Sequence, residues 1–169
     1  LAYDYGISME QYLEKSRNKT ALLMATCLRV GALSTESTEE IANLLYRFGE
    51  ALGMSFQIQD DLLDFTQSAD ILGKPAGSDL RNGQVTLPVL YALQDPELGA
   101  LIRKIGPTSS DEEFAKVLKL INDSDALSRA EEISQDYLDQ AALIVQQLSA
   151  YPAHADLATL LRYFAARDR

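Results

Sequence analysis

The sequence of 169 residues predicts an all-α protein. It lacks the alternation of apolar and polar residues that is typical of strands. It contains helix-start signals instead, in which Ser is followed three residues later by Glu or Gln, the spacing of a capping box. No linker rich in Gly, Ser and Pro divides the chain, so we expect residues 1–169 to form a single helical unit.

Each expected helix follows from these signals and from apolar residues at helical spacing. The expected helices cover residues 9–33, 38–65, 87–94, 96–105, 111–122, 126–148 and 153–166. Capping boxes introduce three of them, at Ser8 and Gln11, at Ser37 and Glu40, and at Ser110 and Glu113. Thr86 can cap the helix that has Pro88 in its first turn. Gly49 and Gly53 lie one turn apart and predict close helix packing, since glycine otherwise weakens a helix.

The composition argues against two classes of function. Nucleic-acid binding requires a basic surface, whereas the formal charge of this chain is −10. The longest uncharged apolar run, residues 20–28, is too short to span a membrane, and we expect a cytoplasmic protein. Cys27 has no cysteine partner and is expected to be a buried small hydrophobe, while His154 is expected to face solvent or cap a helix.

A group of carboxylates interrupts the apolar helix expected at residues 38–65. Asp60, Asp61 and Asp64 share one helical stripe with Gln57, and large apolar residues cover the rest of the helix. We therefore expect the carboxylates to line a cavity. Like charges in a partly dry site favour a cation between them, and an all-oxygen ligand set suits Mg²⁺. The stripe predicts a Mg²⁺–diphosphate site, against the plainer alternative of a solvated acidic face.

The loop at residues 72–88 favours the diphosphate site over the solvated face. Its glycines allow the backbone to approach a ligand closely. Lys74 adds a compact positive charge that suits phosphate.

The order of these motifs resembles the trans-type polyprenyl diphosphate synthases, within the isoprenyl diphosphate synthase family. The run from Phe56 to Pro88 resembles their second aspartate-rich region. Within it, the sequence from Gly73 to Asp79 is most like that of bacterial members such as heptaprenyl diphosphate synthase. Upstream, the pair Lys19–Thr20 matches the lysine-threonine pair of the family. The resemblance implies an antiparallel helical bundle of the isoprenoid synthase type, of which this chain would be the C-terminal half.

The resemblance also implies which residues hold the metal and the diphosphate. Family aspartates that match Asp60, Asp61 and Asp64 help to hold Mg²⁺ against the allylic diphosphate, the first directly and the others partly through water. Lysines that match Lys19 and Lys74 contact that diphosphate.

Further residues are implied beside the reacting carbons. Thr20 and Gln57 match residues whose oxygens can stabilise an allylic cation, and Phe56 matches a residue by the isopentenyl diphosphate site. Asp79, in the matched loop, is expected to bind substrate. The implied reaction joins isopentenyl diphosphate to an allylic diphosphate and yields a linear trans-polyprenyl diphosphate, and it needs no protein nucleophile.

Two departures from the family pattern stand out. Gln84 occupies a position where many members have a lysine that contacts the diphosphate. The earlier aspartate-rich motif of the family, which precedes this region, is not found, and the chain opens at Leu1. We therefore expect a C-terminal fragment that is inactive alone and needs the N-terminal half of the enzyme, within a homodimer or heterodimer.

Two other functions stay open from the sequence. A non-catalytic or regulatory subunit of a heteromeric prenyl synthase would share the fold, but the intact aspartates, Gln57 and Lys19 disfavour it. A terpene cyclase also ionises a diphosphate with Mg²⁺ in a helical fold, but its second metal motif usually mixes Asn, Ser or Thr, and Glu.

Overall fold

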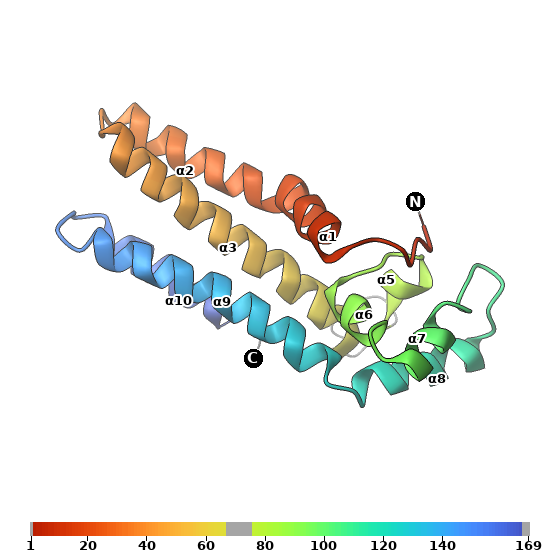
Figure 1. Cartoon of the computed structure of the whole chain (residues 1–169). Helices are drawn as coiled ribbons and strands as arrows, with labels where there is room; N and C mark the ends of the chain where they lie inside the picture. Colours follow the sequence, from red (N-terminus) through yellow and green to blue (C-terminus); the bar gives the residue numbers. More distant parts are fainter. Residues whose placement is uncertain (1, 67–75, 167–169) are drawn as a thin grey trace. The chain divides into compact units, whose positions relative to one another are not determined.

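The computed structural model describes residues 2–66 and 76–166 (Figure 1). Over these ranges the chain forms helices joined by turns and loops and has no strand, which confirms the predicted all-α class. The elements are α1 (Met9–Ser16), the π-helical turn η1 (Arg17–Ala21), α2 (Leu22–Ser34), α3 (Glu39–Thr66), α5 (Ser78–Arg81), α6 (Leu87–Ala92), α7 (Pro96–Ile102), α8 (Asp111–Asn122), α9 (Ala126–Gln147) and α10 (His154–Ala165).

The observed elements differ from the expected ones in two places. The helix expected at residues 9–33 is interrupted by η1, where one turn widens into a π-helix. The short helix α5 lies in the region expected to be a loop. Neither feature has a periodic apolar pattern of its own, which is the signal on which the expectations were based.

The helix caps confirm two of the expected capping boxes and correct a third. The Ser8 hydroxyl accepts from the Gln11 amide at 3.2 Å while the Gln11 side chain accepts from the Ser8 amide at 2.8 Å, and the box at Ser110 is also complete. The prediction that Ser37 caps the second helix is wrong. The Ile41 amide donates to the hydroxyl of Thr38, because α3 begins one residue later than that box requires.

Thr86 occupies the expected N-cap position of α6 without capping it. Its backbone is extended, with φ −103° and ψ 174°, and a proline lies in the first turn as expected. The hydroxyl makes no capping hydrogen bond, and it is buried without a hydrogen-bond partner among the described residues. The prediction is therefore right for the position and wrong for the side chain.

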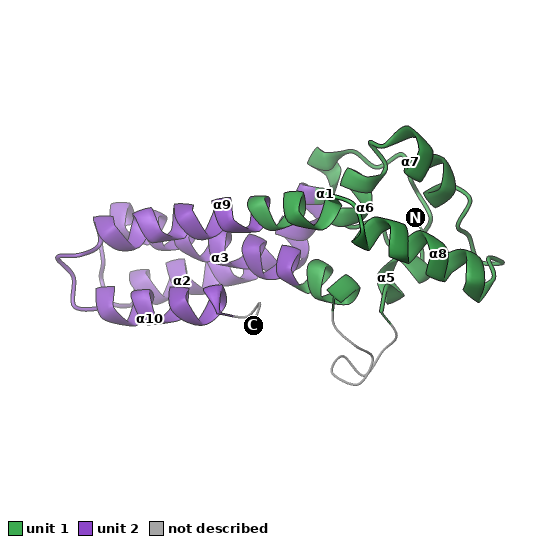
Figure 2. Cartoon of the chain, turned by 90° about the horizontal axis from the view of Figure 1, so that it is seen from below, with its two compact units in different colours: residues 1–12, 60–132 green, residues 13–59, 133–169 purple. Residues whose placement is uncertain are grey.

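The chain folds into two compact units, each assembled from segments that are distant in sequence (Figure 2). Unit 1 contains Leu1–Tyr12 and Asp60–Glu132, and unit 2 contains Leu13–Gln59 and Ile133–Arg169. Helices α1, α3 and α9 each supply residues to both units.

In unit 2, α3 packs against α2, α9 and α10. The core of this unit is one cluster of buried apolar side chains, most of them from α3, α9 and α10. Its members are Phe48, Ala51, Leu52, Leu138, Ala141, Ile144, Val145, Leu148, Leu157 and Phe164. Met24 and Leu28 of α2 pack against this cluster. The burial of these side chains supplies the main stabilising free energy of the unit.

Two glycines of α3 allow α2 to approach its backbone. A Cβ atom on Gly53 would lie 2.5 Å from the Ala21 Cα atom, and one on Gly49 would lie 2.9 Å from the Ala25 Cα atom. The pairs show that the two helices run antiparallel, as they do in Figure 1. Close packing at these glycines, expected from the sequence, is confirmed.

In unit 1, α6 and α7 contact α8, and Leu87, Ile102 and Ile121 are fully buried. The N-terminal segment is attached to this unit by the Tyr5 hydroxyl, which donates to the Ile105 carbonyl at 3.0 Å. Burial, and the neighbouring Tyr3 phenol, raise the pKa of Tyr5 to about 12.

The outward side of α2 corrects the expectation for Cys27. This residue is exposed, not buried, and Leu23 and Val30 on the same helix are 69% and 58% exposed. An apolar pattern at helical spacing shows which residues share a face but not which face is covered. Across the part of the chain that the structure describes, no helix has the length and apolar character needed to cross a membrane.

Substitution Gly53→Ala is expected to destabilise the chain. The new methyl group would press on the backbone of Ala21, and overpacking of this kind costs about 1–3 kcal/mol in the free energy of unfolding. Gly31→Ala is the matched control, because a Cβ atom there meets nothing within 4 Å and alanine favours a helix by about 0.5–1 kcal/mol. Urea unfolding of both variants checks this, and equal effects would contradict it.

The stability of the chain is expected to fall as the pH rises from 10 to about 12. The folded state holds the Tyr5 proton to a higher pH than the unfolded state, so this stabilisation is complete below pH 10 and is lost as the pH approaches the folded pKa. Tyr5→Phe should make the alkaline decline shallower in urea unfolding, whereas the exposed Tyr151→Phe should leave it unchanged. The same slope in Tyr5→Phe and the parent chain would count against the assignment.

Candidate active site

The three aspartates of the sequence motif lie on the last two turns of α3, within unit 1. They differ in exposure, because Asp60 is half-buried whereas Asp61 and Asp64 are 5% and 1% exposed. A buried carboxylate is unstable unless hydrogen-bond donors replace the water it loses. The surroundings of Asp61 and Asp64 supply such donors.

Asp61 is bonded to α1. The Tyr12 hydroxyl donates to Asp61 Oδ2 at 2.6 Å, and Tyr12 itself is 3% exposed. A short bond from a phenol to a carboxylate is charge-assisted and therefore stronger than a bond between neutral groups. It ties α1 to the end of α3 in unit 1.

Asp64 is bonded to the start of α5. Its two carboxylate oxygens accept from the Ser78 hydroxyl at 2.8 Å and from the Asp79 amide at 3.0 Å. Its backbone carbonyl accepts from the Gly77 amide at 2.7 Å. Gly77 has φ 71°, the left-handed region in which glycine is favoured. The Asp64 side chain therefore caps the first turn of α5 from a different helix, whereas a capping residue normally lies next to the helix that it caps.

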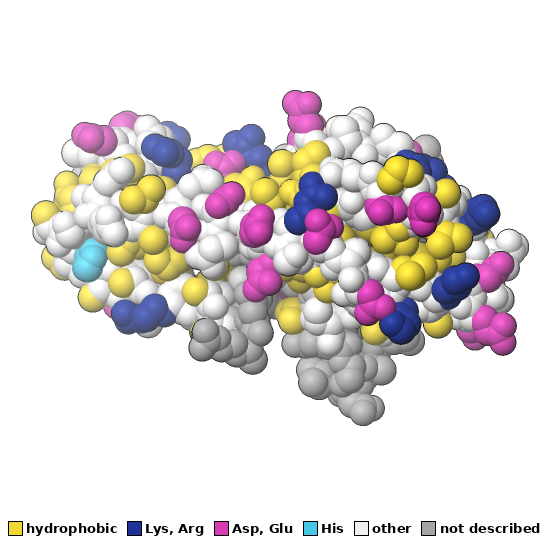
Figure 3. Space-filling view, turned by 60° about the horizontal axis from the view of Figure 1, so that its bottom comes forward, with side chains coloured by type: hydrophobic (Ala, Val, Ile, Leu, Met, Phe, Trp, Pro, Cys, Tyr) yellow, Lys and Arg dark blue, Asp and Glu magenta, His cyan; other side chains and the backbone are white. Residues whose placement is uncertain are grey.

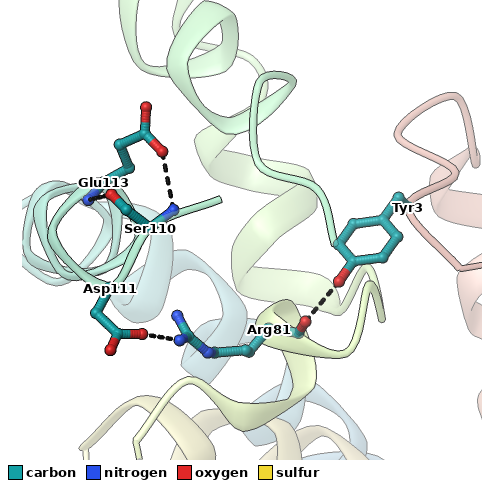
Figure 4. Close-up of polar contacts among 5 residues, drawn as sticks. All are labelled: Tyr3, Arg81, Ser110, Asp111 and Glu113. Atoms are coloured by element: carbon teal, nitrogen blue, oxygen red, sulfur yellow. Dashed lines mark hydrogen bonds and ion pairs between the residues drawn. The ribbon is translucent and has the colours of Figure 1, made fainter. Parts of the chain in front are cut away.

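The far end of α5 is attached to the N-terminal segment and to α8 (Figure 4). The Arg81 carbonyl accepts from the Tyr3 hydroxyl at 2.6 Å, and its guanidinium forms an ion pair with Asp111. The same guanidinium lies 4.8 Å from the centre of the Phe114 ring. The Tyr3 amide also donates to the Gly83 carbonyl at 2.7 Å. Several contacts thus hold the C-terminal end of α5.

In unit 2, the residues expected beside the reacting carbons form a second group. The Thr20 hydroxyl, in η1, donates to the side-chain oxygen of Gln57 at 2.8 Å. Lys19, in the same π-helical turn, is exposed. Phe56 packs on Phe164 of α10, with ring centres 5.7 Å apart. Wide π-helical turns occur often at functional sites, and this one carries the lysine-threonine pair.

An ion pair that sequence reasoning missed lies in unit 2. Arg17, the first residue of η1, pairs with Glu50 of α3. The Glu50 carboxylate raises the pKa of the Arg17 guanidinium, while Tyr46 also hydrogen-bonds Arg17. Burial raises the pKa of the Tyr137 phenol, and the charge of Glu50 raises it further. This cluster joins η1, α3 and α9 by polar contacts.

The donor set of the aspartates suits a hard cation. Among the described residues, no group of three or more His, Cys, Asp or Glu side chains is arranged so that it could hold a metal ion. Mg²⁺ does not need such a group, because it commonly takes one or two carboxylates, keeps several waters and binds phosphate oxygens. The half-buried Asp60, beside two buried carboxylates, fits that pattern. Lys74, expected to bind the diphosphate, lies outside the described residues.

On one face of the molecule the basic side chains are dispersed. On the face seen in Figure 3, Lys and Arg appear as small separate groups among acidic side chains. This distribution agrees with the net charge of −10, which argues against nucleic acid.

The all-α fold of the chain matches the isoprenyl synthase fold, and comparison with known proteins gives the family. The chain belongs to the polyprenyl synthetase family, since residues 2–122 match the family described as Polyprenyl synthetase. Heptaprenyl diphosphate synthase component 2 of Geobacillus stearothermophilus is 45% identical over 166 residues, which are 98% of this chain and 52% of the relative.

Solved structures of the family resemble the chain closely. The crystal structure of heptaprenyl diphosphate synthase from Staphylococcus aureus matches with a TM-score of 0.95 and 34% identity, over 99% of this chain and 53% of that protein. A polyprenyl synthase from Caulobacter crescentus CB15, crystallised with calcium and isoprenyl diphosphate, matches with a TM-score of 0.86 and 32% identity over 99% and 52%. The chain therefore spans about half the length of the relatives it matches.

Two residues of the site could not be found from the sequence motif. Tyr12 lies 49 positions before its partner Asp61, and a lone tyrosine on a helix has no distinguishing signal. Ser78 lies within the loop sequence that resembles the family. Its hydrogen bond to Asp64, however, spans 14 positions and depends on the tertiary fold. Both contacts are tertiary.

Thr20→Val is expected to lower the free energy of unfolding by about 1 kcal/mol, because the buried Gln57 oxygen loses one donor while the side-chain shape is kept. Thr26→Val is the matched control, since the Thr26 hydroxyl donates only to the Leu22 carbonyl within the same helix. Urea unfolding compares the two. An equal loss in both variants would show that the bond between helices adds nothing.

Proposed function

We propose that this chain forms the C-terminal part of an all-α prenyltransferase domain that condenses isopentenyl diphosphate with an allylic diphosphate in the presence of Mg²⁺. The product is a linear trans-polyprenyl diphosphate. The observation that carries the proposal is the pair of buried, hydrogen-bonded aspartates beside the half-buried Asp60 in a chain of this family. The relative crystallised with calcium and isoprenyl diphosphate supports a divalent cation and an isoprenoid diphosphate as ligands.

One set of residues in the chain binds the charged groups, namely the cation and the diphosphate. When bound, Mg²⁺ supplies positive charge for the diphosphate that leaves the allylic substrate. Asp60, Asp61 and Asp64 would hold the cation. Lys19, exposed on η1, binds diphosphate oxygens, and we assign the same role to Lys74.

The neighbouring polar and aromatic groups orient the reacting carbons. Gln57 is fixed by Thr20, so its side-chain dipole does not have to reorganise when positive charge develops on the allylic carbons. Phe56, packed on Phe164, offers an apolar wall for isopentenyl diphosphate, and Asp79 binds substrate from the loop. No side chain of the chain needs to form a covalent intermediate.

The remaining half of the site is supplied from outside this chain. Because the relatives are about twice as long, we propose that a preceding half, with a first aspartate-rich motif, completes the enzyme, and that this chain alone is inactive. The working form is a homodimer or heterodimer in the cytoplasm.

A second candidate is a subunit of a heteromeric prenyl synthase that acts through its partner. The relatives from Geobacillus stearothermophilus and Bacillus subtilis are both named component 2 of heptaprenyl diphosphate synthase, which favours this alternative. In that case the chain would stabilise or regulate a partner rather than bind the reacting carbons.

Activity is expected only when the chain is joined to the part of the Geobacillus stearothermophilus relative that precedes the match. Radiolabelled isopentenyl diphosphate, an allylic primer and Mg²⁺ should then give a longer linear diphosphate, and a chelator should abolish it. Asp60→Asn should remove activity, whereas Asp136→Asn, an exposed acid on α9, should preserve it.

The other outcomes separate the alternatives. A hydrocarbon product would indicate a terpene cyclase, and no product from the joined protein would favour the subunit. Condensation by the 169-residue chain alone would contradict the proposal that it is inactive.

A further inference from the structure

We propose that Tyr3 is a positioning residue for substrate binding. From the N-terminal segment, it holds the turn at residues 81–84, called the α5 turn below, and through this turn it fixes the position of Asp79. The inference rests on the proposed function, because that function assigns substrate binding to Asp79.

The backbone of Tyr3 is strained. Its φ of 60° lies in the left-handed region, which a bulky side chain rarely adopts. Glu36 has a similar φ of 58°, but there the end of α2 explains it. The Ser37 amide donates to the Ala32 carbonyl and the Glu36 amide to the Leu33 carbonyl, which is the Schellman pattern of a helix end. Tyr3 lies ahead of α1 and at no helix end in the described part of the chain, so its own contacts must offset the strain.

Two hydrogen bonds join Tyr3 to the α5 turn. The Tyr3 hydroxyl donates to the Arg81 carbonyl at 2.6 Å (Figure 4), and the Tyr3 amide donates to the Gly83 carbonyl at 2.7 Å. Gly83 is also left-handed, with φ 75°, and a Cβ atom there would lie 2.6 Å from both the amide nitrogen and the Cδ2 atom of Tyr3. Glycine therefore allows the N-terminal segment to approach the turn.

The α5 turn is bonded directly to Asp79. The Gln84 amide donates to the Asp79 carbonyl at 2.8 Å, and the Gly83 amide donates to the Leu80 carbonyl at 2.9 Å. Because α5 has four residues, it is too short to be stable by itself. Its first turn is capped from α3, and the N-terminal segment holds its other end. The position of Asp79 therefore depends on both attachments.

The Arg81 side chain is a weaker restraint on the same turn. Its ion pair with Asp111 joins side chains that are 42% and 87% exposed, and ion pairs in water contribute little. The bonds from Tyr3 end on backbone carbonyl groups of the turn itself. Tyr3 is therefore the residue whose removal should loosen the turn most.

Hydrogen exchange of the 169-residue chain tests the attachment without an activity assay. Tyr3→Phe is expected to speed exchange of the amides at residues 82–84 about fivefold, the effect of losing one hydrogen bond from a local structure. Tyr5→Phe is the matched control, because it removes a phenol bond from the same segment to the Ile105 carbonyl instead. It should leave these three amides unchanged.

Steady-state kinetics test the role in substrate binding. They require the active protein described above, in which the chain is joined to the preceding part of the Geobacillus stearothermophilus relative. Tyr3→Phe should raise the KM of the allylic diphosphate about threefold to fivefold, because a smaller fraction of the protein has the loop ordered for binding. The kcat should change less than the KM, and Tyr5→Phe should change neither.

A double-mutant cycle tests whether Tyr3 acts through the α5 turn. Gly83→Ala should raise the same KM about tenfold, because a side chain is strained at φ 75° and would displace Tyr3. The double variant should then have the KM of Gly83→Ala alone, since both changes break one contact. Gly106→Ala is the control, because a Cβ atom there meets nothing within 4 Å.

The outcomes separate this inference from the proposed function. In an active joined protein, a KM of Tyr3→Phe equal to that of the parent, equal rises in Tyr3→Phe and Tyr5→Phe, or multiplied effects in the double variant would each overturn the inference alone. An inactive joined protein would overturn the proposed function and, with it, the role of Tyr3 in substrate binding. Faster exchange and a raised KM in Tyr3→Phe, with Tyr5→Phe unchanged, support the inference.

Discussion

Negative charge held inside the protein at the end of α3 is the constraint on which the candidate site depends. A carboxylate that is almost wholly excluded from water, as Asp64 is, requires donors in fixed positions. The hydroxyl of Ser78, the amide of Asp79 and the phenol of Tyr12 are these donors for Asp64 and Asp61. In unit 1, α1 and α5 are therefore both attached to the end of α3 through these carboxylates.

The second constraint is the close approach of α2 and α3 in unit 2. Gly53 and Gly49 remove the side chains that would separate the helix backbones, and η1 adds a wide turn just before α2. At that turn the Thr20 hydroxyl reaches Gln57. The contact between Thr20 and Gln57 thus depends on glycines that lie one and two turns before Gln57 in α3.

Much of the helical fold was predictable from the sequence because its signals are local. The capping boxes at Ser8 and Ser110 and the long apolar patterns marked most of the helices. The failures have physical reasons. Adjacent hydroxyls at Ser37 and Thr38 could both cap α3, and only the backbone decides between them. The expectation for Cys27 failed because a helical stripe does not reveal whether another element covers it.

The chain sequence by itself determined the helical class, the common face of Asp60, Asp61 and Asp64, and the resemblance to a family that the comparisons confirm. These features depend on neighbours within one or two helical turns or on residues in fixed order. Only the tertiary structure decided that the three aspartates differ. Their partners lie 49 and 14 positions away, so the donors that bury Asp61 and Asp64 come together only when α1 and α5 fold against α3.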